Sequence, residues 1–171
     1  MKKKLLIIGA SGHGKVVADI ALSLGKWEEI YFLDDDKSIK KSLGLEVIGT
    51  TNKIADYIDE YDMFVGIGNN EIRKKLYMKL EQLGASIPVL VHPSAVVGKE
   101  VTIDKGTVVM AGVVINCSTT IGKACIINTG STIDHDNEIG NFVHISPGAN
   151  LAGTVKVGES SWLGIGCVVS N

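Results

Sequence analysis

Aliphatic residues recur at every sixth position through the second half of the chain, from Val97 to Val169 without interruption. Since six is a multiple of the strand period of two, these side chains face the same way if each hexad holds a short strand and a turn. Three hexads, about eighteen residues, then close one triangular coil, and successive coils stack like paired strands. The series consists of Val97, Ile103, Val109, Ile115, Ile121, Ile127, Ile133, Ile139, Ile145, Leu151, Val157, Leu163 and Val169.

A second series, two residues earlier in each hexad, predicts the other inward positions. Its residues are nearly all small or β-branched, which suits a narrow core. Glycine often follows the aliphatic residue, and there we expect the backbone to bend or to take a positive φ. The second series consists of Ala95, Val101, Thr107, Val113, Thr119, Cys125, Ser131, Asn137, Val143, Ala149, Val155, Ser161 and Cys167, and the glycines are Gly98, Gly122, Gly140, Gly158 and Gly164.

The first ninety residues alternate strand and helix patterns instead. Short apolar runs predict strands at 5–8, 30–33, 63–67 and 86–91. Helical patterns lie between them, and the first follows a glycine-rich turn at 9–14. Strands that alternate with helices predict a small, open parallel sheet of the Rossmann-like type.

The two longer helices have recognisable ends. The first is expected to end at Gly25, and the second to begin at Asn69 or Asn70, either of which can serve as its N-cap. Spacing of the apolar residues predicts the inner side of the second helix. That side carries Ile72, Leu76, Leu80 and Leu83.

Together the two patterns predict an α/β domain over residues 1–91 and an all-β helix of hexapeptide repeats over residues 92–171. The repeat breaks off after Val169 in the middle of a hexad. An open coil would leave an uncovered strand edge, so we expect the intact protein to continue beyond Asn171.

Charge and composition narrow the class of partner. A formal charge of −2 gives no electrostatic reason to expect nucleic acid. No apolar run is long enough for a membrane span or a secretion signal, so we expect a cytoplasmic protein without membrane insertion. Cysteines and histidines lack metal-ligand spacing, so no metal is expected. We interpret Cys117, Cys125 and Cys167 as buried structural thiols.

The turn at 9–14 and the aspartates Asp34, Asp35 and Asp36 predict a nucleotide site. Glycines let backbone N–H groups at a helix start approach a phosphate, and carboxylates at the end of a parallel strand can bind ribose or base. The glycine order is G-x-x-G-x-G rather than G-x-G-x-x-G, so it does not specify a dinucleotide. A simple tight turn and a solvated acidic loop are the structural alternatives.

Four segments in this order resemble bacterial sugar N-acetyltransferases that act on UDP-4-amino sugars, the bacillosamine-pathway type of hexapeptide-repeat enzyme. They are GASGHG at 9–14, FLDDD at 32–36, IGNNEIRKK at 67–75 and INTGSTIDHDNEIGNFVHISPGANLAG at 127–153. Sialic-acid O-acetyltransferases are similar in both domains. The resemblance implies a left-handed parallel β-helix and acetyl-CoA as co-substrate.

The same resemblance implies where the substrates bind. It places the UDP diphosphate on the glycine-rich turn and the uridine near the aspartates, with the next loop and helix lining the same pocket. It also places acetyl-CoA against His144, and the backbone N–H of Gly153 at the thioester carbonyl oxygen. The implied UDP-sugar residues are Gly12, His13, Asp34, Asp35, Ile67, Gly68 and Arg73.

His135 is the expected general base. It lies with Asp136 at the outward turn positions of a hexad, and neutral imidazole suits the acceptance of a proton from an attacking amine. Asp136 is expected to orient the imidazole or to favour its protonated form. An exposed turn residue at His135 and an outer packing residue at His144 are the structural alternatives.

The hexad register predicts self-association. His144 also points outward, but two faces further along the coil than His135, and a corner and the opposite face of one prism cannot meet. If both histidines serve one site, a second subunit supplies one of them, and a homotrimer does so three times.

The sequence therefore predicts an acetyl-CoA-dependent N-acetyltransferase that acylates the amino group of a UDP-linked 4-amino-4,6-dideoxy sugar directly, without a cysteine nucleophile. A sialic-acid or other sugar O-acetyltransferase is the nearest alternative. Alternatives of another class are an NAD-dependent oxidoreductase, disfavoured by the glycine order, and a non-catalytic nucleotide-binding scaffold.

Overall fold

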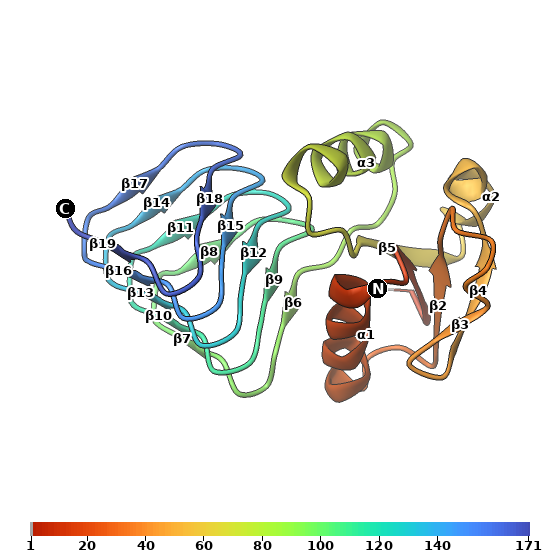
Figure 1. Cartoon of the computed structure of the whole chain (residues 1–171), viewed down its shortest axis with the longest axis horizontal. Coiled ribbons are helices and arrows are strands. Elements are labelled where there is room, and N and C mark those ends of the chain that lie inside the picture. The colour runs from red at the N-terminus through yellow and green to blue at the C-terminus, as the bar shows by residue number, and fades with distance from the viewer. Residues whose placement is uncertain (1) are drawn as a thin grey trace. The chain divides into compact units, whose positions relative to one another are not determined.

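The computed structural model describes residues 2–171, which fall into two compact units with the boundary between Pro88 and Val89 (Figure 1). Leu90–Val91, expected in the strand that ends the first domain, instead form β6 and pair with Val108–Val109 of the second unit. Within residues 2–171, no helix combines the length and the apolar character that crossing a membrane requires.

The first unit is a five-stranded sheet in the order β3-β4-β2-β1-β5. Its central strands are parallel and apolar, and residues 5–8 of β1 are fully buried. The hairpin of β3 and β4, which the sequence analysis did not predict, adds one antiparallel pairing at the edge. The elements are β1 (Lys4–Ile8), α1 (Gly12–Leu24), β2 (Glu29–Leu33), β3 (Lys41–Ser42), β4 (Leu45–Gly49), the 3-10 turn η1 (Thr51–Lys53), α2 (Ile54–Tyr57), β5 (Tyr61–Val65) and α3 (Asn70–Gln82).

The expected end of α1 and the expected start of α3 are both confirmed. Gly25 takes a left-handed conformation after α1, and the side chain of Asn69 accepts a hydrogen bond from the backbone N–H of Ile72 at 3.0 Å. The predicted inner side of α3 is wrong in part. Its buried residues are Arg73, Tyr77 and Leu80, whereas Ile72 is 52% exposed.

The second unit is the expected stack of triangular coils. Each strand has two residues and pairs in parallel with the strand eighteen residues further on, as Ile115 does with Ile133 and Ile133 with Leu151. The three faces are β7-β10-β13-β16-β19, β8-β11-β14-β17 and β6-β9-β12-β15-β18. The strands are β6 (Leu90–Val91), β7 (Val96–Val97), β8 (Thr102–Ile103), β9 (Val108–Val109), β10 (Val114–Ile115), β11 (Thr120–Ile121), β12 (Ile126–Ile127), β13 (Thr132–Ile133), β14 (Glu138–Ile139), β15 (His144–Ile145), β16 (Asn150–Leu151), β17 (Lys156–Val157), β18 (Trp162–Leu163) and β19 (Val168–Val169).

Positive φ angles also recur every six residues, but not where the sequence analysis expected them. They lie three residues after the inward aliphatic, as at Asp136 with φ 57°. At three of the positions directly after the aliphatic residue, glycine is needed because the next coil comes too close for a side chain. A Cβ at Gly98, Gly122 or Gly140 would come within 2.6–2.8 Å of atoms in the next coil.

The cysteines divide between the interior and the surface. Cys125 is buried inside the coils, Cys167 is partly exposed and Cys117 is exposed, so the expectation that all three thiols are buried is confirmed for Cys125 only. Cys117 lies on a turn, where the outward positions are not covered by the narrow core.

Candidate active site

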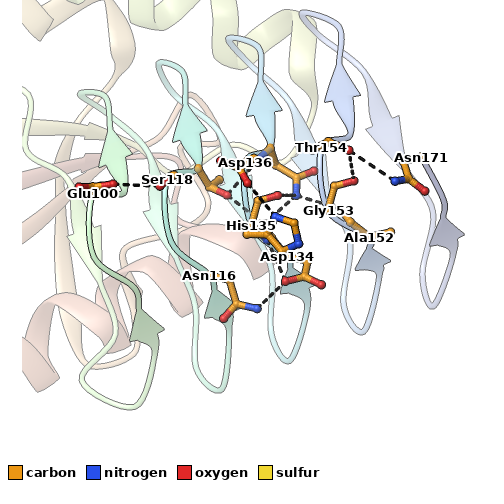
Figure 2. A network of polar contacts seen from close by, with 12 residues as sticks. Glu100, Asn116, Ser118, Asp134, His135, Asp136, Ala152, Gly153, Thr154 and Asn171 are labelled. Atoms are coloured by element: carbon orange, nitrogen blue, oxygen red, sulfur yellow. Dashed lines mark hydrogen bonds and ion pairs between the residues drawn. The ribbon is translucent and has the colours of Figure 1, made fainter.

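The corner between β13 and β14 carries His135 and Asp136, as the hexad register predicted (Figure 2). The imidazole Nδ1 lies 2.8 Å from a carboxylate oxygen of Asp136, and both side chains are about half exposed, at 52% and 57%. A carboxylate can only accept, so Nδ1 carries a proton in this pair. In the neutral ring Nε2 then has the lone pair and can accept a proton.

Two carboxylates raise the pKa of His135 above its usual range. The larger effect is the hydrogen bond to Asp136, and the smaller is the negative charge of Asp134. Asp134 accepts hydrogen bonds from the Asn116 amide and from the backbone N–H of His135, both at 2.8 Å, which lower its own pKa. The carboxylates thus stabilise the imidazolium that forms when His135 takes a proton.

Gly153 lies beside His135, one coil further on. A Cβ at Gly153 would lie 2.6 Å from Cε1 and 2.7 Å from Nε2 of the imidazole. The two turns are joined by a hydrogen bond of 2.9 Å from the Thr154 N–H to the His135 carbonyl. Any side chain at position 153 would therefore displace the ring that carries the candidate base.

His144 is on β15 and is 8% exposed. Its ring stacks on that of Trp162, with centroids 5.3 Å apart and planes inclined by 6°. Nε2 lies 3.2 Å from the amide nitrogen of Asn128, whose oxygen accepts from the Thr129 N–H at 2.8 Å. Because that amide is oriented in this way, Nε2 of His144 accepts and the ring proton is on Nδ1.

One chain does not bring His135 and His144 to the same place. His135 lies at the corner between the faces that contain β13 and β14, whereas His144 lies on the third face, which contains β15. The outward placement of both residues is as expected from the hexads, although His144 is covered by its neighbours.

In the first unit, a cleft of about 880 Å³ opens beside the carboxyl ends of β1 and β2. Three of the expected substrate residues, Asp34, Asp35 and Ile67, line it, whereas Gly12, His13, Gly68 and Arg73 do not. Its other lining residues are Ile8, Gly9, Thr51, Asn52, Ile72, Lys75, Leu76, Met78, Lys79 and Gln82.

Both aspartates of the cleft already organise the loops around it. Asp34 accepts from the backbone N–H of Ala10 at 2.7 Å, which ties the glycine-rich turn to the end of β2. Asp35 accepts from the backbone N–H and the hydroxyl of Thr51 at 2.8 and 2.9 Å. Each carboxylate oxygen keeps a further lone pair, so a ligand donor can still bind.

Arg73 has a different place from the one expected. Its side chain is 1% exposed and donates to the carbonyl oxygens of Ile67 and Gly68 at 3.2 and 2.9 Å, and to the side chain of Asn70 at 2.7 Å. A guanidinium buried among these acceptors supports the loop at 67–70 and presents no face to the cleft. In this arrangement, the guanidinium of Arg73 is not positioned for the expected contact with phosphate.

Two cations that were not expected at the nucleotide site line the cleft. Lys75 and Lys79 lie on the same side of α3 as Ile72, and the Lys79 ammonium is 3.4 Å from the Thr51 carbonyl oxygen. Their spacing of three and four residues was the available signal, since such residues share a helix face. That face lines the cleft instead of packing in the core.

Residues 4–80 match the family described as the PglD N-terminal domain. The chain is 35% identical over 112 residues to UDP-N-acetylbacillosamine N-acetyltransferase of Bacillus subtilis (strain 168), covering 64% of this chain and 52% of that protein. It is 30% identical over 169 residues to GDP-perosamine N-acetyltransferase of Escherichia coli O157:H7, covering 95% of this chain and 76% of that protein.

Solved structures agree over nearly the whole chain. The acetyltransferase domain of PglB from Neisseria gonorrhoeae FA1090, in complex with acetyl coenzyme A, has 36% identity and a TM-score of 0.90, covering 100% of this chain and 94% of that chain. A mutant perosamine N-acetyltransferase from Caulobacter crescentus, in complex with CoA and GDP-perosamine, has 38% identity and a TM-score of 0.93, covering 98% and 80%. The chain belongs to the family of sugar N-acetyltransferases that includes these bacillosamine and perosamine enzymes.

Proposed function

We propose that this protein transfers the acetyl group of acetyl-CoA to the 4-amino group of a UDP-linked 4-amino-4,6-dideoxy sugar, with His135 as the general base. The observation that carries the proposal is the His135–Asp136 pair. At 2.8 Å it fixes the proton on Nδ1 and leaves Nε2 as the acceptor on an exposed corner. A base in this state can accept the proton that an attacking amine must lose.

The transfer replaces the carbon–sulfur bond of the thioester with a carbon–nitrogen bond to the sugar. As the amine nitrogen forms its bond to the thioester carbonyl carbon, Nε2 of His135 takes the amine proton. The carbon–sulfur bond then breaks, and CoA leaves as a thiolate that takes this proton from the imidazolium and departs as the free thiol. Asp136 and Asp134 stabilise the imidazolium. The backbone N–H of Gly153 donates to the carbonyl oxygen, where negative charge develops. No cysteine is required, and the acyl group passes directly between substrates.

Two features support the choice of substrates. Solved relatives contain acetyl coenzyme A in one case, and CoA with GDP-perosamine in another. The cleft of the first unit combines carboxylates that suit ribose or base with lysines that suit a diphosphate.

We propose a homotrimer as the active species. His135 lies at a corner and His144 on the opposite face, so one complete site needs His135 from one subunit and His144 from a neighbour. Three prisms packed side by side form three such sites. His144, with its proton on Nδ1, then contacts acetyl-CoA from the neighbouring subunit.

The test compares His135→Ala with a matched histidine, His92→Ala. His92 lies near the start of the second unit. Its ring is hydrogen-bonded to the backbone N–H and the hydroxyl of Ser94. Release of CoA thiol is followed with a UDP-4-amino-4,6-dideoxy sugar, GDP-perosamine and sialic acid as acceptors. We expect a loss of about 100-fold or more in kcat for His135→Ala only.

Each acceptor has a distinct meaning in this assay. Turnover of the UDP sugar above the others supports the proposal. Faster turnover of GDP-perosamine would change the nucleotide and keep the mechanism, while acetylation of sialic acid alone would replace the amine with a hydroxyl. Unchanged turnover in His135→Ala would remove His135 from the chemistry.

A further inference from the structure

Asn137 is an amide inside the narrow core of the β-helix, where apolar and small side chains predominate. It is fully buried, and its Nδ2 donates to three backbone carbonyl oxygens. The acceptors are Asp134 at 2.7 Å, His135 at 3.3 Å and Ala152 at 2.9 Å. One side chain therefore holds the turn of the candidate base and the turn of the next coil from within.

The Ala152 carbonyl belongs to the same peptide unit as the Gly153 N–H. Every described peptide bond is trans, so the C=O and N–H of this unit point in opposite directions. Because the carbonyl is directed inward to Asn137, the N–H of Gly153 is directed outward, on the side of the corner that carries His135. A hydrogen bond to the carbonyl also polarises the peptide and makes its N–H a better donor.

We propose that Asn137 is a positioning residue for acetyl transfer: it fixes the Gly153 N–H and the His135 turn in one frame, so that the oxyanion donor and the base keep their spacing. The inference rests on the proposed roles of His135 and Gly153. Asn137 is buried and touches neither substrate, so it acts only through the two turns.

Packing alone does not call for an amide at this position. The same column of the prism holds Val101 and Val155 in the coils two before and one after, so the core accepts a β-branched apolar side chain there. Thr119, in the coil directly before, shows what a hydroxyl does at this register. Its Oγ1 donates to the carbonyl fifteen residues further on, that of Asp134, at 2.9 Å.

These neighbours supply a set of three variants. Asn137→Val removes all three donor contacts with a side chain that the column already accepts. Asn137→Thr places a hydroxyl fifteen residues before Ala152, as Thr119 is before Asp134, and so restores the donor to the Ala152 carbonyl. Thr107→Val is the matched control, because Thr107 Oγ1 donates at 2.7 Å to Gly122, on a corner that carries no candidate site residue.

The measurements are kcat and KM with acetyl-CoA and the UDP-4-amino-4,6-dideoxy sugar, and the amide resonance of Gly153 by NMR on the same full chain. We expect Asn137→Val to lower kcat by about 10- to 100-fold with KM for acetyl-CoA nearly unchanged, and to shift the Gly153 resonance. Asn137→Thr should recover most of both properties, and Thr107→Val should change neither.

Equal kcat and an equal Gly153 resonance in Asn137→Val and Thr107→Val would overturn the positioning role. That result would stand even if His135→Ala is inactive, so it is distinct from failure of the proposed function. If His135→Ala stays active, the Gly153 resonance alone decides whether Asn137 orients the peptide. Should Asn137→Val not fold, Asn137→Ala with Thr107→Ala as its control gives the same comparison.

Discussion

The imidazole of His135 occupies the space that a side chain at Gly153 would need, since a Cβ there would lie 2.7 Å from Nε2. The ring beside its Cα is therefore the reason that residue 153 is glycine (Figure 2). The relationship links two residues eighteen positions apart, which only the stacking of coils brings together.

Gly153→Ala should reduce acetyl transfer by about 100-fold, because a misplacement of the base by about 1 Å has an effect of this order. The His135 ring is half exposed and can move away, so the fold should persist. The measurements are kcat and the thermal unfolding midpoint. Gly164→Ala, where nothing lies within 4 Å of the added Cβ, is the control and should leave both unchanged.

Asp136→Asn should move the acid limb of the pH–rate profile to lower pH. The hydrogen bond to the Asp136 carboxylate is the main cause of the raised pKa of His135, so a neutral acceptor in its place lets that pKa fall and the neutral base persists in more acidic solution. The amide oxygen can still accept from Nδ1, so the tautomer is kept while kcat falls about tenfold. An acid limb that stays in place in kcat/KM profiles would exclude Asp136 as this cause.

Arg73→Leu should destabilise the protein by about 2–4 kcal/mol, because the buried carbonyls of Ile67 and Gly68 would lose their donors. Urea unfolding of the variant and the parent gives the difference in free energy. Loss of nucleotide-sugar affinity with full stability would instead assign Arg73 to the ligand.

Lys75→Ala should show the opposite pattern. Lys75 is exposed and lines the cleft, so its removal should raise KM for the nucleotide sugar by up to about fivefold at low salt. The effect should shrink as salt is added, while the urea midpoint stays at the parent value. Lys74→Ala, on the neighbouring position of α3, is the control that should leave KM unchanged.

Mixing two inactive variants tests the shared site. His135→Ala and His144→Ala subunits, unfolded and refolded together in equal amounts, should recover about a quarter of the parent activity, since a site is complete only where the right subunits adjoin. Each variant refolded alone should remain inactive. No recovery in mixtures that form trimers would place both histidines in separate roles.

Patterns within one hexad predicted the architecture well. The inward aliphatics and the outward His135 and Asp136 follow from the strand period alone. Side-chain contacts between successive coils were not predictable in this way, so the packing of Gly153 on His135 and the hydrogen bond from Asn137 to Ala152 needed coordinates. Arg73 was assigned to the UDP sugar by resemblance, and its burial was not expected because it depends on carbonyl acceptors, which leave no mark in an apolar pattern.

The eighteen-residue pairing of the strands has a consequence for how such chains can change length. Removing one or two hexads between His135 and Gly153 would carry the glycine round to a different edge of the prism and separate it from the imidazole. Removing or adding hexads in multiples of three elsewhere would leave the alignment of Gly153 and His135 intact. Viable insertions and deletions in this part of the molecule should therefore come in complete turns.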